Sequence, residues 1–281
     1  MRRKTYIQVL LYAAALVVAV FMLAPFAWML IASVQPQAEL VSLPLPWWPE
    51  HFYPDRYLAI FTSPDPTSVK FRAGLVNSLI VSTAVVVISM VVGVFGAYAF
   101  ARLRFKFRRA ILMLFLFTYM LPQIALLIPL YMILSNLNLL DNVVGLIIVD
   151  CSLVVPFVLW ILSNYFLTIP QELEEQAWID GASRVGALFR IVLPTAGPGI
   201  FAACMFAFLL AWDEFMYALI FTSSNASKTA PVAIAEFSAQ HSTDFGLVAA
   251  GGVLAALPPV VLAVIFQRNV VSGLVSGAVK T

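Results

Sequence analysis

Six long apolar segments alternate with shorter polar ones along this chain. Each apolar segment has about 20 residues or more, the length needed to cross a hydrocarbon core of about 30 Å. Within lipid, the backbone N–H and C=O groups of a span must bond inside that span, so each segment is expected to form a helix. The sequence therefore predicts an all-α, polytopic membrane protein with six transmembrane helices, at residues Ile7–Val34, Leu75–Ala101, Ala110–Leu134, Val143–Leu167, Pro198–Phe221 and Phe245–Phe266.

The composition agrees with this pattern and excludes several classes of protein. Hydrophobic residues make up 62% of the 281 residues and charged residues 11%, whereas a soluble domain has about 25% charged residues. A formal net charge of +2 gives no reason to expect a nucleic-acid partner. Both cysteines, Cys151 and Cys204, lie in apolar segments, so we expect neither a disulfide nor a thiolate metal site.

The distribution of Lys and Arg predicts the orientation of the spans. If the N-terminus is cytoplasmic, the segments on that side carry twelve of the 16 basic residues and the opposite segments carry four. The positive-inside rule then places both termini in the cytoplasm. The run RLRFKFRR at Arg102–Arg109 could bind anionic lipid or nucleic acid, but a short basic hairpin between spans is more often a determinant of topology.

The N-terminal part is expected to be an anchor helix and an outer loop. The basic residues Arg2–Lys4 precede the first span, as in a signal peptide, but the span is longer than a signal segment and no clear cleavage site follows, so we interpret it as a retained anchor. The loop contains PLPWWPEHFYP at Pro44–Pro54, whose rings suit a membrane interface and could also stack on a sugar. We therefore divide the chain into an N-terminal anchor with a periplasmic loop, 1–74, and a core domain, 75–281.

Small and hydroxyl residues mark one face of the second predicted span. Ser78, Ser82 and Ser89 lie close to this face, which Gly93 and Gly96 continue. Residues of this kind allow helices to approach closely, so we interpret the face as a packing surface. The two histidines, which lie in outer loops, have no further ligand at metal-binding spacing, and no metal site is expected.

Few polar side chains interrupt the predicted spans, and those that do are candidates for function. A carboxylate inside a bilayer costs several kcal/mol unless it is paired or hydrated. At 1.5 Å per residue, Asp150 lies roughly 10 Å and Asp213 roughly 22 Å along its span, so both fall in the outer half of the membrane. Such groups suit a hydrophilic solute; alternatively, Asp213 or Glu214 caps a helical kink or bonds a neighbouring helix. The predicted substrate pathway comprises Gln123, Asp150, Trp212, Asp213 and Glu214.

One long polar segment, Pro170–Pro194, separates the fourth and fifth spans. Proline ends the preceding span because it lacks an N–H group. Acidic residues then fill the first turn of a short helix, where the helix dipole favours them. This helix is predicted to reach about Asp180, Gly181 permits a left-handed turn, and a second helix covers Ala182–Ile191 and closes at Pro194. The segment is thus expected to form two short cytoplasmic helices joined at a glycine.

The spacing of this segment resembles the EAA loop, the signature of the membrane subunits of ABC importers. The matching positions are Glu175, Gln176, Ala177, Gly181, Ile191, Leu193 and Pro194. The flanking sequences LIPLYMILSNLNLLDNVVGLII, AWDEFMYALIF and QRNVVSGLVSGAVK resemble the carbohydrate importer permeases of the maltose-transporter inner-membrane type. The resemblance extends from about Ala73 to the end of the chain and implies a type I ABC importer permease architecture.

In that family the EAA loop forms a coupling helix that inserts into a cleft of a cytoplasmic ATPase. Small residues would permit close approach, and acidic ones would pair with cations of the ATPase. Gln176 departs from the family pattern, which usually has alanine there, although glutamine keeps helix propensity. The residues to which the resemblance gives this coupling role are Glu174, Glu175, Gln176, Ala177, Asp180, Gly181, Leu193 and Pro194.

Two further regions acquire a role from the resemblance. The C-terminal tail of the family reaches the interface between the ATPase copies, which implies contacts for Gly273, Gly277 and Lys280. In the fourth span, relatives commonly have a Pro-Tyr pair where this chain has Val149 and Asp150. We therefore expect Asp150 to tune the choice of solute.

The resemblance implies the transmembrane subunit of an ATP-driven importer, which moves a disaccharide, an oligosaccharide or a related polyol into the cytoplasm by alternating access. The expected partners are a second, related permease subunit, two copies of a cytoplasmic ATPase, an extracytoplasmic solute-binding protein and the lipid bilayer of the bacterial inner membrane. No G-x-x-x-x-G-K-[ST] phosphate loop occurs, so we expect no enzymatic activity and no bound cofactor, with ATP and Mg held by the ATPase. The alternative is a secondary transporter or channel driven by an ion gradient.

Overall fold

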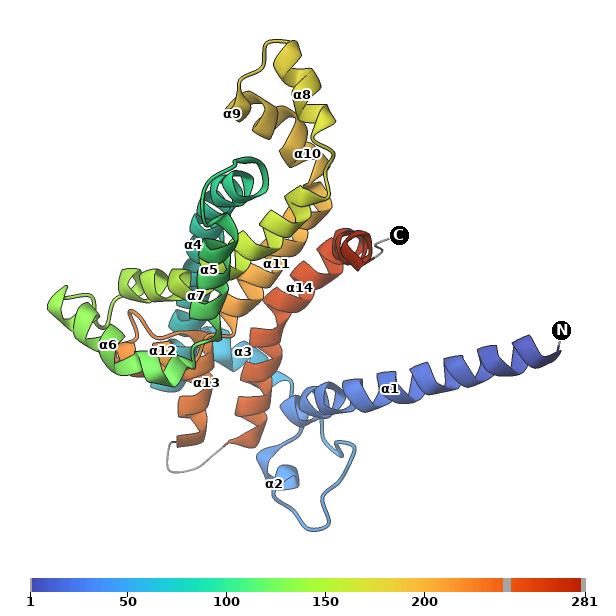
Figure 1. Ribbon diagram of the computed structural model, residues 1–281. Helices are drawn as coiled ribbons and strands as arrows, with labels where there is room; N and C mark the ends of the chain where they lie inside the picture. Colours follow the sequence, from blue (N-terminus) through green and yellow to red (C-terminus); the bar gives the residue numbers. More distant parts are fainter. Residues whose placement is uncertain (1, 240–243, 279–281) are drawn as a thin grey trace. The chain divides into compact units, whose positions relative to one another are not determined.

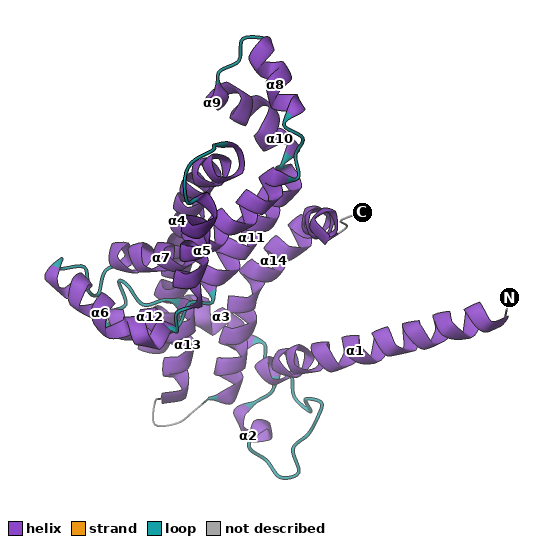
Figure 2. Ribbon diagram, viewed as in Figure 1, coloured by secondary structure: helices purple, strands orange, loops and turns teal. Residues whose placement is uncertain are grey.

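A computed structural model of the chain describes the backbone of residues 2–239 and 244–278, and the side chains of residues 6–237 and 244–267. Within these ranges every regular element is helical, as predicted, and no strand is present (Figures 1 and 2). The helices group into two compact units, one of Met1–Arg72 with Ala233–Leu257 and one of Ala73–Val232 with Pro258–Thr281. The division drawn from sequence after residue 74 stays a prediction.

The helices in chain order are α1 (Arg2–Val34), α2 (Gln37–Leu40), α3 (Asp55–Thr62), α4 (Pro66–Arg102), α5 (Arg108–Met120), α6 (Gln123–Asn136), α7 (Val143–Leu167), α8 (Glu172–Ile179), α9 (Arg184–Ala187), the π-helical turn η1 (Leu188–Val192), α10 (Leu193–Thr195), α11 (Gly197–Trp212), α12 (Met216–Phe221), α13 (Ala230–Ala239) and α14 (Phe245–Ala278).

Four helical stretches of the described chain are long and apolar enough to cross a membrane on their own. They agree with the first, second, fourth and sixth predicted spans, and comprise Tyr6–Val34, Pro66–Arg102, Val143–Leu167 and Phe245–Gln267. If each bent pair of helices is counted as one span, the number rises to as many as six. The total of six spans and the cytoplasmic position of both termini therefore stay predictions.

The third predicted span, Ala110–Leu134, is not one straight helix. It is divided into α5 and α6, which are bent by 94° relative to one another. The break occurs at Leu121, whose backbone is extended, with φ −64° and ψ 134°. Leu121 precedes Pro122, and the ring of a proline disfavours the helical conformation in the residue before it.

The fifth predicted span, Pro198–Phe221, is also interrupted. Helix α11 ends at Trp212, and α12 begins only at Met216. At its other end, α11 is bent by 82° from the helical stretch Arg184–Thr195. The separation from the preceding short helix agrees with the prediction, which closed that helix at Pro194 and began the span at Pro198. The interruption after Trp212 agrees with the alternative of a kink at Asp213 or Glu214, and not with one continuous helix.

Arg56 organises the first unit. Its guanidinium is buried, donates hydrogen bonds to the carbonyl oxygens of Gln35 at 2.5 Å and Ser33 at 3.4 Å, and pairs with Asp244 at 3.3 Å. A Cβ atom added to Gly246 would lie 2.2 Å from Cζ of Arg56, so this glycine makes room for the guanidinium. One buried cation thereby joins the end of α1 to the start of α14.

In the second unit, α7 packs against α5 and α11. Helix α4 also approaches α7 closely, since a Cβ atom on Gly93 would lie 2.6 Å from Cγ1 of Val158 and one on Gly96 would lie 2.8 Å from Cδ1 of Leu159. The serines of the same face, Ser78, Ser82 and Ser89, are buried. The interpretation of this face of α4 as a packing surface is therefore confirmed.

The carboxylate of Asp141, in the turn between α6 and α7, holds the loop that follows α12. One of its oxygens accepts hydrogen bonds from the backbone N–H groups of Ser223 and Ser224, both at 2.9 Å, and from the hydroxyl of Ser227. Partial burial opposes ionisation, but these hydrogen bonds outweigh it and hold the pKa of Asp141 well below its usual value. An ionised carboxylate therefore fastens this end of the second unit at neutral pH.

Candidate functional site

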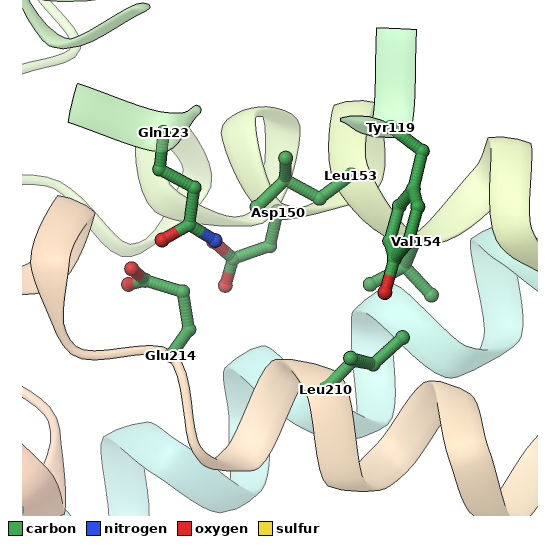
Figure 3. A pocket seen from close by; sticks show the side chains of 7 residues that line it. All are labelled: Tyr119, Gln123, Asp150, Leu153, Val154, Leu210 and Glu214. Atoms are coloured by element: carbon green, nitrogen blue, oxygen red, sulfur yellow. The ribbon is translucent and has the colours of Figure 1, made fainter. Parts of the chain in front are cut away.

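Two carboxylates, an amide and a phenol meet in one pocket of the second unit. Its volume is about 210 Å³, and it is lined by Tyr119, Gln123, Asp150, Leu153, Val154, Leu210 and Glu214. Figure 3 shows the amide of Gln123 and the carboxylates of Asp150 and Glu214 pointing toward one another, with the hydroxyl of Tyr119 directed into the same space. Three of the five residues predicted for a substrate pathway are thus brought together.

Asp150 places a buried carboxyl group in the wall of this pocket. The side chain of Asn142 accepts a hydrogen bond from the backbone N–H of Val144 at 2.8 Å and caps the start of α7, which places Asp150 two turns inside the helix. The residue is 1% exposed, and neither carboxylate oxygen has a hydrogen-bond partner among the described residues. Leaving a buried polar group unpaired costs several kcal/mol. The carboxyl of Asp150 is therefore available to a ligand.

Glu214 has a structural role as well as a place in the pocket. Its two carboxylate oxygens accept hydrogen bonds from the backbone N–H groups of Tyr217 at 2.7 Å and Ala218 at 2.9 Å. These N–H groups belong to the first turns of α12 and have no partner within that helix. The alternative in which a carboxylate caps a kink is confirmed for Glu214, and the same side chain still borders the pocket.

Trp212 and Asp213 do not line the pocket. The ring of Trp212 is buried and stacks on Phe208, with the ring centroids 5.4 Å apart. Asp213 is exposed and lies at the C-terminal end of α11. Asp213 had been assigned to the substrate pathway as an acid within a predicted span, and Trp212 as a ring suited to a sugar. A helix that ends at Trp212 directs these adjacent side chains to different surroundings.

Tyr119 was missed by the sequence reasoning. Its ring stacks on Phe157 of α7, with the centroids 5.4 Å apart. The feature that could have identified Tyr119 is its hydroxyl group, which lies about one helical turn before Gln123 in an apolar segment. The two side chains reach the same pocket because the chain bends after α5.

The second candidate site is the polar segment between α7 and α11. Helix α8 is followed by Gly181 in a left-handed conformation, with φ 87°, which confirms the predicted glycine turn. The hydroxyl of Ser183 then accepts a hydrogen bond from the backbone N–H of Gly186 at 3.1 Å and caps α9. In Figure 1 the helices α8, α9 and α10 lie together beyond the ends of α4 and α11.

The second half of this segment differs from the prediction of a helix that closes at Pro194. The helix does not close at Pro194 but continues through η1 and α10 to Thr195. A proline inside a regular α-helix clashes with the carbonyl four residues earlier. The π-helical turn immediately before α10 widens the helix at that point, which accommodates Pro194 without ending the helix.

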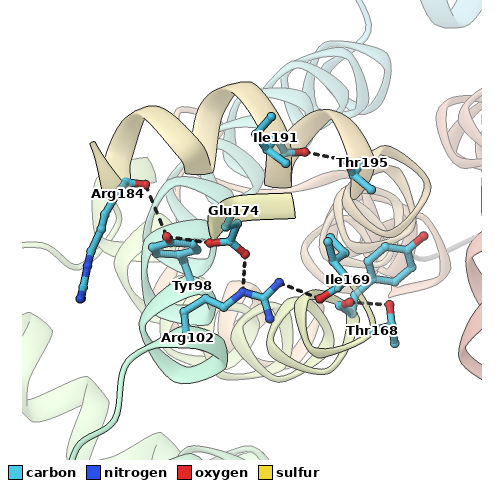
Figure 4. Close-up of polar contacts among 9 residues, drawn as sticks. Tyr98, Arg102, Thr168, Ile169, Glu174, Arg184, Ile191 and Thr195 are labelled. Atoms are coloured by element: carbon cyan, nitrogen blue, oxygen red, sulfur yellow. Dashed lines mark hydrogen bonds and ion pairs between the residues drawn. The ribbon is translucent and has the colours of Figure 1, made fainter. Parts of the chain in front are cut away.

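A buried ion pair fastens α8 to the end of α4. The Glu174 carboxylate pairs with the guanidinium of Arg102 and accepts a hydrogen bond from the hydroxyl of Tyr98 at 2.9 Å. Arg102 also donates to the carbonyl oxygen of Ile169 at 2.9 Å, and the same Tyr98 hydroxyl lies 3.4 Å from the carbonyl oxygen of Arg184 (Figure 4). The coupling role of Glu174 stays a prediction, and its buried carboxylate positions the segment instead of lying on the exposed side of α8.

The other predicted coupling residues lie at or near the surface of the described chain. The exposed ones are Glu175, Gln176, Asp180, Gly181 and Pro194, and the half-buried ones are Ala177 and Leu193. The predicted tail contacts are described less fully: Gly273 and Gly277 lie within α14, whereas Lys280 lies outside the described residues.

Comparisons with known proteins place the chain among membrane transport components. Residues 76–275 match the family described as binding-protein-dependent transport system inner membrane component. The chain is 37% identical over 269 residues to the sulfoquinovosyl glycerol transport system permease protein of Agrobacterium fabrum, covering 96% of this chain and 93% of that protein. It is 34% identical over 281 residues to the trehalose/maltose transport system permease protein of Thermococcus litoralis, covering 100% of this chain and 99% of that protein.

The fold is also similar to that of a solved structure. A chain from the crystal structure of a bacterial ABC transporter involved in the import of the acidic polysaccharide alginate superimposes with a TM-score of 0.76 at 20% identity. The similarity covers 95% of this chain and 98% of that chain.

Proposed function

Because the chain belongs to the family of binding-protein-dependent transport system inner membrane components, we propose that it is the permease subunit of an ABC importer that moves a sugar or a related polyol into the cytoplasm. It is a multi-pass protein of the inner membrane. Similar proteins are named for transport of sulfoquinovosyl glycerol, trehalose/maltose, diacetylchitobiose and trehalose. These names support a sugar as the solute and differ too much to assign a single one.

The observation that carries this proposal is the construction of the segment between α7 and α11. It presents an exposed short helix, α8, and fixes that helix to the end of the long helix α4 through Arg102 and Glu174. A helix-in-groove contact on the exposed side of α8 would therefore act on α4 directly. This arrangement suits a part that receives a force from a partner and passes it to the spans.

The proposed partner at this segment is a cytoplasmic ATPase, present in two copies. ATP and Mg bind to that ATPase, and this chain contributes no catalytic group. When ATP draws the two copies together, the coupling segments move with them and switch the cavity between inward-facing and outward-facing states. Each state needs its own stabilising contacts, which nucleotide supplies on one side and a loaded solute-binding protein supplies on the other.

The remaining partners complete the cavity. A second, related permease subunit would form a heterodimer with this chain, and an extracytoplasmic solute-binding protein would deliver the sugar. The bilayer covers the apolar faces of α1, α4, α7 and α14, which carry many exposed hydrophobic side chains.

The proposal predicts uptake that depends on ATP and not on ion gradients. The chain, assembled with its co-purifying subunits in proteoliposomes, should accumulate the sugar bound by its binding protein when ATP is enclosed with the ATPase and ionophores have collapsed the proton and sodium gradients. A control with ADP in place of ATP should show no accumulation. Uptake that follows an imposed gradient and is indifferent to ATP would show that the chain is a secondary transporter.

A further inference from the structure

The pocket between α5, α6, α7 and α11 is lined by acidic side chains and by no basic one. Of the seven side chains that line it, two are carboxylic acids, and none is lysine, arginine or histidine. Salt bridges among the described residues do not include either Asp150 or Glu214. The pocket therefore offers hydrogen-bond acceptors in excess, with the amide of Gln123 and the hydroxyl of Tyr119 as its side-chain donors.

Asp150 and Glu214 differ in how many hydrogen bonds their carboxylate oxygens already accept. Both oxygens of Glu214 already accept backbone hydrogen bonds from α12, which fixes the position of this carboxylate. Both oxygens of Asp150 are buried in the pocket wall without a partner. A carboxylate normally accepts hydrogen bonds at both oxygens, so the site lacks the donors that Asp150 needs.

A sugar carries hydrogen-bond donors of the kind that the oxygens of Asp150 lack. Hydroxyl groups and ammonium groups can donate to Asp150, whereas a carboxylate or sulfonate group would bring a third acidic group beside two others with no cation present. Two like charges a few Å apart repel one another strongly when they are shielded from water. The volume of about 210 Å³ suits part of a solute, such as one face of a single sugar ring, and not a whole oligosaccharide.

We propose that Asp150, Glu214, Gln123 and Tyr119 form a solute subsite that binds hydroxyl or ammonium donors of a neutral or amino sugar and rejects acidic sugars. This inference rests on the proposed function, because it assumes that a sugar passes the pocket. It goes beyond that function, since it assigns a charge selectivity to this subunit in addition to any selectivity of a binding protein.

The test uses an introduced cysteine as a reporter in the assembled transporter. Cys151 and Cys204 are replaced by alanine, and Leu210→Cys supplies a thiol in the pocket wall, with Leu153→Cys as an independent second position. The thiol is labelled with a cationic trimethylammonium methanethiosulfonate or with an anionic sulfonate methanethiosulfonate. Each rate is divided by the rate of the same reagent with free 2-mercaptoethanol, so that intrinsic reactivity cancels.

We expect the cationic reagent to react on the order of tenfold faster than the anionic one after this normalisation, because the acidic pair Asp150 and Glu214 attracts a cation and repels an anion. Asp150→Asn should reduce the ratio severalfold. The matched control Asp213→Asn removes the same charge from an exposed position outside the pocket and should leave the ratio unchanged. In the same assay, trehalose and glucosamine should slow labelling, while glucuronate at equal concentration should not, and Asp150→Asn should allow glucuronate to protect.

Equal normalised rates, protection by glucuronate equal to that by trehalose, or absence of labelling at both positions would each overturn the proposed subsite. None of these readouts needs ATP. A transporter that fails the ATP-dependent uptake test but shows the expected labelling would contradict the proposed function alone, whereas ATP-driven uptake with equal labelling rates would contradict only the subsite.

Discussion

Replacing Glu174 by glutamine is expected to lower the free energy of unfolding of the assembled transporter by about 3–5 kcal/mol and to disconnect sugar uptake from ATP hydrolysis. The substitution keeps the shape of the side chain but leaves the guanidinium of Arg102, which is 5% exposed, without its counter-charge. An unpaired buried charge is far more costly than an absent pair. The measurement is thermal unfolding of the purified complex in nanodiscs, together with uptake and ATPase rates.

The neighbouring residue on α8 supplies a matched control. Glu175 carries the same charge but is exposed, so Glu175→Gln should change the free energy of unfolding by less than about 0.5 kcal/mol. If it meets the ATPase as proposed, its effect should fall on ATPase activity alone. A double variant, Arg102→Met with Glu174→Met, should recover much of the stability, because it leaves no buried charge.

Two results would contradict this account of the ion pair. The first is equal loss of stability in Glu174→Gln and Glu175→Gln, which would mean that burial does not distinguish them. The second is full coupling in Glu174→Gln despite a measurable loss of stability, which would show that the ion pair stabilises the fold without transmitting movement from α8 to α4.

Replacing Gly181 by leucine is the second change with a large expected effect. A leucine in the left-handed conformation of Gly181, with φ 87°, costs roughly 1–2 kcal/mol. No atom of the described chain lies within 4 Å of a Cβ atom added there, so any further loss must come from a partner that approaches closely. We expect uptake to fall by roughly tenfold, the change that about 1.4 kcal/mol produces, while insertion into the membrane is unaffected.

The variant Gly181→Asn distinguishes strain in the backbone from close approach by a partner. Asparagine visits the left-handed conformation at lower cost than leucine, so it should preserve the turn while adding a side chain at the surface. Loss of ATPase docking in both variants would assign the effect to close approach by the partner. Loss in the leucine variant alone would assign it to the backbone. Wild-type ATPase stimulation by the loaded binding protein in Gly181→Leu would contradict a coupling role for this turn.

Hydropathy predicted much of this fold because lipid leaves a spanning backbone few alternatives to a helix. It did not predict where those helices break. Pro122 ends a helix, whereas Pro129 and Pro156 lie inside helices, so the presence of a proline does not decide the outcome. A proline is tolerated inside a helix where neighbouring groups bond the backbone atoms that it frees, and that information is spread over distant parts of the chain.

In the candidate sites, too, the sequence predicted which residues are unusual but not which of them lie together. Asp150 and Glu214 could each be singled out because an acid within a membrane is costly, but their meeting in one pocket depends on how α11 packs against α7. Glu174 and Glu175 are adjacent and chemically almost identical in the sequence. Only the position of Arg102, 72 residues away, makes one of them a buried anchor and leaves the other on the surface.

The most direct test of the coupling segment is photocrosslinking from Gln176 in the assembled transporter. A benzoyl-phenylalanine at this exposed position of α8 should form an adduct with the ATPase subunit, and the yield should change when ATP is bound. The same probe at Asn225, an exposed residue of the loop between α12 and α13, should form no adduct with the ATPase. Absence of the Gln176 adduct in a complex that hydrolyses ATP, or an ATPase adduct from Asn225, would contradict the claim that this chain receives force through the segment between α7 and α11.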